Sequence, residues 1–143
     1  MTTITFRDGV MAADSAINDG GVVMANLAPK IARNKHGDLA GACGTASYCD
    51  KFLDWFRNGE KGERPDPADD GGALVARHGG DLELYDKGGL SYLKVPYYAL
   101  GSGYKVAIGA MWMGADAEKA IECGIAHDVY TRPPIYMLRH DES

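Results

Sequence analysis

Thr2 is the residue whose position gives it the most distinctive chemistry. A threonine hydroxyl is a weak nucleophile unless a base is adjacent, and a threonine at the start of a chain can use its own α-amine, whose ordinary pKa is roughly 7.7–8.0. Because threonine is small, the initiator Met1 before it is of the kind that cellular aminopeptidases usually remove. Threonine after methionine is also common for unrelated reasons, so the surroundings of Thr2 must decide its role.

Asp14 and Lys30 could supply the polar surroundings that such a threonine needs. Asp14 ends the second of two expected strands, 2–7 and 10–13, and Lys30 begins a later strand. Hairpin pairing would bring both side chains beside Thr2, where a cation lowers the pKa of a nearby amine or hydroxyl and a carboxylate holds the cation. Two plainer interpretations stay open, since Asp14 could cap a hairpin and Lys30 could be a solvated strand residue.

The segment that contains Thr2 and Asp14, MTTITFRDGVMAADS, resembles the opening of proteasome β-type subunits and of the bacterial peptidase HslV, which are N-terminal-nucleophile hydrolases. In that family TT begins the mature chain, and a DGVVMAADS-like run ends in the active-site aspartate. Four further segments resemble the family in the same order: PKI at 29–31, GACGTA at 41–46, ALGSG at 99–103 and HDVYT at 127–131. Together the segments span nearly the whole chain, which makes the resemblance far more specific than any one motif.

The resemblance implies a complete acyl-transfer site. Its catalytic residues would be Thr2, Asp14, Lys30, Gly44, Ser102 and Asp128. Gly44 would contribute a backbone N–H to the oxyanion hole at the point where a strand turns into a helix, so that charge on the tetrahedral intermediate meets a fixed donor. Ser102 and Asp128 would hydrogen-bond around the Thr2 amine and orient it. Independently of the family, Ser102 could instead be the N-cap of a helix.

The resemblance also implies a substrate pocket for the residue that precedes the scissile bond. The positions that line this pocket in the family are occupied here by Ile17, Ala28, Ala32, Ala42 and Ala46. A pocket lined in this way is apolar and fairly open. We therefore expect a preference for hydrophobic residues, although apolar pockets discriminate only modestly among apolar groups.

The apolar patterns predict an α+β fold. Besides 2–7 and 10–13, strands are expected at 22–25, 30–33, 39–42, 73–77, 82–85, 91–95, 97–100 and 135–139. Helices are expected from 45 until the stop at 58–59, after 103 through 113, and at 116–127. This order excludes a βαβ repeat and places helices outside antiparallel sheets. The resemblance implies a four-layer αββα sandwich, the fold of N-terminal-nucleophile hydrolases, formed by a single domain over residues 1–143.

Two segments depart from the family pattern. Residues 59–72 form a polar loop with two prolines where the family usually has a second long helix, so one outer-layer helix is expected to be shortened or missing. Because that region supports ring contacts and ATPase docking in the family, ring stoichiometry and an ATPase unfoldase partner stay open. After Asp128, Arg132 and two prolines occupy positions where glycine is common, and a positive-φ turn would be difficult to keep there.

Composition excludes several other classes of protein. The chain has 143 residues and a formal net charge of -5, without the basic cluster that nucleic-acid binding needs. Its three cysteines cannot all pair within one chain and its four histidines have no metal-ligand spacing, so neither a disulfide scaffold nor a metal site is expected, and no cofactor is implied. Neither a signal peptide nor an apolar membrane span is recognisable, which favours the cytoplasm.

The leading functional hypothesis is a threonine peptidase, in a homo-oligomer, that cleaves peptides or unfolded proteins after removal of Met1. A catalytically silent structural or assembly subunit of the same fold is the first alternative. The second is an N-terminal-nucleophile amidohydrolase that acts on a small-molecule amide, because a fold does not determine a substrate.

Overall fold

The smaller of the two main sheets has four antiparallel strands in the order β10-β1-β2-β11, which are Tyr97–Gly101, Thr3–Arg7, Val10–Ala13 and Tyr136–Arg139. The computed structural model describes residues 2–15, 17–19, 22–25, 30–68 and 70–142, with 17–19 and 22–25 described as backbone only.

The turn between β1 and β2 has positive φ at Asp8 (52°) and Gly9 (76°). A two-residue hairpin turn requires this conformation, so the predicted hairpin is confirmed.

The larger sheet has five antiparallel strands in sequence order, β5 (Ile31–Arg33), β6 (Leu39–Cys43), β7 (Gly72–Ala76), β8 (Leu82–Asp86) and β9 (Gly89–Leu93). A separate hairpin joins β3 (Ile17–Asp19) and β4 (Val22–Ala25). The prediction of a strand at 91–95 is wrong by two residues. Gly89 pairs with Asp86 directly after a two-residue turn, and its φ of 122° shows that this glycine opens the strand rather than preceding it.

The helices occupy the expected positions. α1 (Ala46–Arg57) begins where the Thr45 hydroxyl accepts a hydrogen bond from the Tyr48 N–H at 3.1 Å, which is a side-chain N-cap. α2 (Tyr104–Trp112) starts at Gly103 without a side-chain cap. α3 (Ala117–His127) is capped by Asp116, whose carboxylate accepts from the Lys119 N–H at 2.8 Å. None of the described helices is long and apolar enough to cross a membrane.

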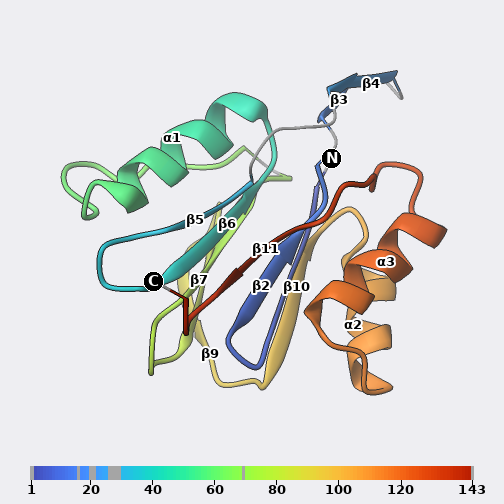
Figure 1. Cartoon of the computed structure of the whole chain (residues 1–143). Coiled ribbons are helices and arrows are strands. Elements are labelled where there is room, and N and C mark those ends of the chain that lie inside the picture. The colour runs from blue at the N-terminus through green and yellow to red at the C-terminus, as the bar shows by residue number, and fades with distance from the viewer. Residues whose placement is uncertain (1, 16, 20–21, 26–29, 69, 143) are drawn as a thin grey trace.

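The elements form four layers, as Figure 1 shows. α1 lies across the outer face of the five-stranded sheet, and α2 and α3 lie along the outer face of the four-stranded sheet. The inner faces of the two sheets enclose a buried apolar layer that includes Ile4, Met11, Leu39 and Leu74. The predicted αββα sandwich of antiparallel sheets is therefore confirmed.

The connection from α1 to β7 contains no helix among its described residues, 58–68 and 70–71. The absence of the second outer helix that the sequence predicts is thus a property of the fold. Each end of this connection makes a main-chain hydrogen bond. The Glu60 N–H donates to the Trp55 carbonyl at 2.8 Å, and the Gly71 N–H donates to the Ala68 carbonyl at 2.9 Å. The connection therefore begins with a hydrogen bond to α1 and ends with a local hydrogen bond before β7.

The close stacking of the two sheets depends on Gly41 in β6. A β-carbon at this position would lie 2.9 Å from Cδ1 and Cγ2 of Ile4 and 3.2 Å from Cγ2 of Ile31. The two contacts with Ile4 are too short, the third is tight, and Ile4 is fully buried. The first strand can approach β6 this closely because residue 41 has no side chain.

We predict that Gly41→Ala lowers the free energy of unfolding by about 1–3 kcal/mol, because overpacking a buried layer forces side chains or strands apart. Gly109→Ala is the matched control, since nothing lies within 4 Å of a β-carbon at this exposed position in α2. The control should be neutral or stabilising by up to about 1 kcal/mol. Urea unfolding of both variants measures the difference, and equal midpoints would contradict the packing argument.

Candidate active site

Five of the predicted catalytic residues lie where strands begin or end at one end of the sandwich. Thr2 precedes β1, Asp14 follows β2, Lys30 precedes β5, Gly44 follows β6 and Ser102 follows β10. Figure 1 shows the start of β1 and the junction between β6 and α1 at the same end of the two sheets. The alternating directions of antiparallel strands thus gather residues that are far apart in the sequence.

The Asp14 carboxylate joins three segments of the chain at this end. Its Oδ1 accepts hydrogen bonds from the Thr3 N–H at 3.0 Å and from the Lys30 ammonium at 3.3 Å. Its Oδ2 accepts from the Arg132 N–H at 3.0 Å. The Asp14 side chain is 0% exposed. A single buried carboxylate therefore holds the residue after Thr2, the predicted cation, and the segment before β11.

Lys30 is not the solvated strand residue of the plainer interpretation, because its side chain is only 5% exposed. Burial is the main influence on its pKa, which it lowers, while the charge and hydrogen bond of Asp14 act in the opposite direction. The net result is a lysine pKa below the ordinary value. An ammonium group held in this way is both an acid and a local positive charge at the start of β1.

A second polar network includes the side chain of Thr3. The Gly103 N–H donates to Thr3 Oγ1 at 3.0 Å, and Thr3 Oγ1 is 2.8 Å from Thr131 Oγ1. Thr131 Oγ1 donates to Asp128 Oδ2 at 2.5 Å, and Ser102 Oγ donates to the same oxygen at 2.6 Å. Since the hydroxyl proton of Thr131 is used on Asp128, the Thr3 hydroxyl must donate to Thr131. The chain of donors therefore ends on one carboxylate.

The structure brings the predicted residues Ser102 and Asp128 together and adds Thr131, which the sequence analysis missed. Thr131 is 3% exposed and belongs to the HDVYT segment, so its position three residues after Asp128 was the available signal. The N-cap interpretation of Ser102 is wrong, because Gly103 occupies the cap position of α2 and makes no side-chain bond. The Ser102 hydroxyl binds Asp128 instead.

The main chain of Thr2 is held by the turn after β10. The Ser102 N–H donates to the Thr2 carbonyl at 2.9 Å. Gly101 has a φ of 102°, and a β-carbon there would lie 1.6 Å from the Thr2 carbonyl oxygen. Only glycine can satisfy both the conformation and the close approach. The motif ALGSG thus has a physical reason in the placement of Thr2.

Gly44 presents an unused donor at the junction between β6 and α1. Its φ is 125°, and its N–H donates to no acceptor among the residues that the structure describes. Gly44 is half-buried, so this N–H is not simply a group on an open surface. A backbone donor without an intramolecular acceptor is what an oxyanion hole provides.

The predicted pocket positions are only partly brought together. Ala32 and Ala42 are buried in one apolar cluster beneath α1, which also contains Phe52. Ala46 is the exposed first residue of α1. Ile17 begins β3, of which only the backbone is described, and Ala28 lies outside the described residues.

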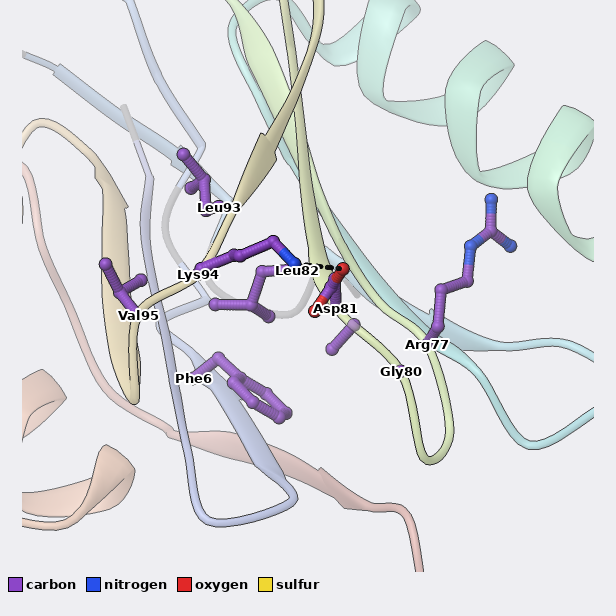
Figure 2. Close-up of a pocket in the computed structure, with 9 residues that line it drawn as sticks. Phe6, Arg77, Gly80, Asp81, Leu82, Leu93, Lys94 and Val95 are labelled. Carbon is purple, nitrogen blue, oxygen red and sulfur yellow. Dashed lines mark ion pairs between the residues drawn. The ribbon is translucent and has the colours of Figure 1, made fainter.

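Two pockets lie away from the candidate active site. One of about 260 Å³ lies between the end of β1 and the turns that flank β8 and β9, and Figure 2 shows Phe6, Leu82 and Leu93 around it, with Lys94 paired to Asp81 at 3.9 Å. The other, of about 510 Å³, lies between β10 and α2 and is lined by Arg7, Val95, Pro96, Tyr97, Tyr98, Ile108, Met111 and Trp112. Neither includes any predicted catalytic residue.

No cysteine near the site is suited to act as the nucleophile in place of Thr2. Burial raises the pKa of Cys43 to about 12 and that of Cys49 to about 11, so both thiols are protonated near neutrality. The part of the chain that the structure describes also holds no group of three or more His, Cys, Asp or Glu side chains that could bind a metal ion.

The fold is shared with solved structures of low sequence identity. Two structures of BPH from Thiobacillus denitrificans, one of them in complex with epoxomicin, superimpose on this chain with a TM-score of 0.70. The sequence identity is 17% for the complex and 16% for the other structure. Each alignment covers 99% of this chain and 99% of the BPH chain. Eukaryotic HslV from Trypanosoma brucei superimposes with a TM-score of 0.71 at 18% identity, over 96% of this chain and 99% of that chain. No protein-family model and no curated protein matches the sequence. The chain therefore has the fold of HslV and proteasome β-type subunits.

We predict that Lys30→Met lowers the free energy of unfolding by about 3 kcal/mol, because it removes the ammonium that pairs with the buried Asp14 carboxylate. Lys51→Met is the matched control, since Lys51 is exposed on α1, and its effect should stay within about 0.5 kcal/mol. Chemical unfolding followed by circular dichroism measures both. Similar stabilities for the two variants would show that the ion pair is not needed to hold this end of the sandwich.

Proposed function

We propose that this protein is a threonine peptidase of the proteasome and HslV type, with Thr2 as its N-terminal nucleophile. One observation carries the proposal: the buried Asp14 carboxylate accepts both the Thr3 N–H and the Lys30 ammonium on the same oxygen. This arrangement puts a cation beside the start of the chain, where it favours a neutral amine and an ionisable hydroxyl on Thr2. Thr2 must be the first residue of the mature chain for the amine to be free.

The reaction would proceed as acyl transfer in two halves. The Thr2 hydroxyl oxygen attacks the scissile carbonyl carbon while the Thr2 amine takes the hydroxyl proton. The carbon–nitrogen bond then breaks, and the ammonium returns the proton to the leaving amine, which leaves an ester on Thr2. Water, deprotonated by the same amine, attacks this ester; the bond between the acyl carbon and the Thr2 hydroxyl oxygen then breaks, the ammonium returns the proton to that oxygen, and the second product leaves as a carboxylic acid. The proton balance closes on one residue.

The surrounding residues would each act on a different part of this reaction. The Gly44 N–H donates to the oxyanion of each tetrahedral intermediate. Ser102 and Asp128, joined at 2.6 Å, orient the Thr2 amine, and Thr131 supports the same carboxylate. Lys30 lowers the pKa of the groups on Thr2 and is itself held by Asp14.

The substrate and the assembly follow from the same proposal. The buried alanines at 32 and 42 support an apolar pocket for the residue before the scissile bond, together with Ile17, Ala28 and Ala46. We place the enzyme in the cytoplasm as a single-domain chain that forms a homo-oligomer and cleaves peptides or unfolded proteins. A protein of this fold from Thiobacillus denitrificans binds epoxomicin, and we propose that this chain binds it too.

We predict that a peptide vinyl sulfone, which alkylates nucleophiles irreversibly, adds once to the purified protein, and only to molecules that have lost Met1. Thr2→Ala should remove both the adduct and the peptidase activity, whereas Thr2→Ser keeps a hydroxyl and should retain measurable activity. Intact-protein mass spectrometry and a peptide assay report these outcomes together. Full activity in protein that retains Met1 would overturn the mechanism.

The same measurement separates the alternatives. An inert protein that retains Met1 would be a silent structural subunit. Labelling of Thr2 without cleavage of any peptide or unfolded protein would indicate a small-molecule amidohydrolase.

We predict a preference for apolar residues before the scissile bond in a panel of fluorogenic peptides, because the proposed lining has no charged group to pair with an acidic or basic side chain. Two apolar residues that differ by one methylene should differ in kcat/KM by about 10- to 200-fold. A clear preference for acidic or basic residues would contradict the proposed lining.

A further inference from the structure

The connection between α1 and β7 ends directly against Gly44. A β-carbon on Gly44 would lie 2.9 Å from the Cα atom of Gly71, which is the last residue of this connection. The next residue, Gly72, pairs with Cys43 at the end of β6. The backbones of residues 43–44 and 71–72 are therefore packed together at the point where the proposed oxyanion donor lies.

Gly71 has little room of its own. A β-carbon on it would lie 3.0 Å from Cβ of Pro67 and 3.3 Å from the Cys43 carbonyl oxygen. Pro67 is buried, and the Gly71 N–H closes the turn onto Ala68 at 2.9 Å. Any added group at residue 71 must therefore displace either the buried proline or the Cys43 carbonyl.

The Cys43 carbonyl is significant because it belongs to the same peptide unit as the Gly44 N–H. A peptide unit is planar and rigid, so a tilt of the carbonyl oxygen tilts the N–H that points away from it by the same angle. A β-carbon at residue 71 would crowd this oxygen, and a shift of the oxygen would change the direction in which the Gly44 N–H points. No other described residue is needed to transmit the effect.

Two described residues earlier in the connection, Glu60 and Arg64, contact the five-stranded sheet or the turn beside it. The Arg77 guanidinium donates to both carboxylate oxygens of Glu60, at 2.7 and 2.8 Å. Further along, the Arg64 guanidinium lies 5.0 Å from the centre of the Tyr85 ring. Bidentate and stacked arginine contacts restrict geometry as well as adding energy.

We propose that Gly71 is a positioning residue for the oxyanion hole: by packing against the Cys43–Gly44 peptide unit it aligns the Gly44 N–H with the developing oxyanion. This inference rests on the proposed function, since it assigns a role within the same acyl-transfer site. Gly71 does not touch substrate, and it acts only through Gly44. The missing outer helix is thus replaced by a connection with a role in the site.

The test compares Gly71→Ala with Gly109→Ala, an exposed glycine with nothing within 4 Å of its β-carbon position. We expect Gly71→Ala to lower kcat by about 10- to 100-fold with KM nearly unchanged, because small misplacements of a catalytic group have effects of this size. Gly109→Ala should retain the wild-type kcat. A folded Gly71→Ala variant with wild-type kcat would overturn the proposal.

Inhibitor binding separates positioning from general damage. A peptide aldehyde forms a tetrahedral adduct with the Thr2 hydroxyl and develops an oxyanion, whereas the peptide alcohol of the same sequence does not. Gly71→Ala should weaken the aldehyde by the same factor as kcat and leave the affinity for the alcohol unchanged. Equal weakening of both compounds would show a damaged pocket rather than a tilted donor.

A second variant keeps the proposal testable if Gly71→Ala does not fold. Pro67→Gly removes the group that supports Gly71 without adding an atom near Gly44, and Pro65→Gly is its control for the entropy of the unfolded chain. Pro67→Gly should lower kcat and aldehyde affinity by about threefold relative to Pro65→Gly. Equal values for the two variants would overturn the proposal.

If the proposed function itself were wrong, the experiments would give a different result from the one that rejects the role of Gly71. In that case wild-type protein that has lost Met1 would show neither vinyl sulfone labelling nor peptide cleavage. If wild-type protein is labelled and active while the Gly71 and Pro67 variants match their controls, the proposed function stands and the role of Gly71 is rejected.

Discussion

The organisation of the candidate site depends on one buried carboxylate, that of Asp14. It receives main-chain donors from Thr3 and Arg132 and a cation from Lys30, and its side chain is 0% exposed. A buried charge of this kind is stable only when its partners are in place, so it forces three distant segments to meet at one end of the two sheets. The start of β1 is held there because the Thr3 N–H is one of those partners.

The same burial sets the local electrostatics. Desolvation lowers the pKa of Lys30, while the charge and hydrogen bond of Asp14 oppose that shift. Desolvation also raises the pKa of Cys43 and Cys49, which keeps both thiols neutral beside the cation. Neither thiol is therefore ionised near neutrality, and the Lys30 cation forms an ion pair with the Asp14 carboxylate.

Much of the fold could be predicted from the sequence, because the determining signals are local. The Asp8–Gly9 turn and the apolar spacing of α1 each depend on neighbouring residues. Prediction was less accurate at β9, where Gly89 begins a strand instead of ending a turn. A glycine is compatible with both states, and only the pairing of Gly89 with Asp86 decides between them.

The site was predictable only through the resemblance to a family, because its contacts join residues far apart in the sequence. Asp14 and Lys30 are ordinary strand-end residues until the two sheets bring them together. The spacing of Thr131 after Asp128 indicates their mutual hydrogen bond, but the contact of Thr131 with Thr3 depends on two distant segments meeting. The hydrogen bond of Ser102 with Asp128, rather than a helix cap, likewise depends on where α3 ends.

Three glycines matter to both the fold and the candidate site, because each permits a close approach that a side chain would block. Gly41 admits Ile4 between the sheets, Gly101 admits the Thr2 carbonyl, and Gly44 admits Gly71. Each contact depends on the absence of a β-carbon rather than on a particular side chain. Any side chain at these three positions would therefore displace Ile4, the Thr2 carbonyl or Gly71.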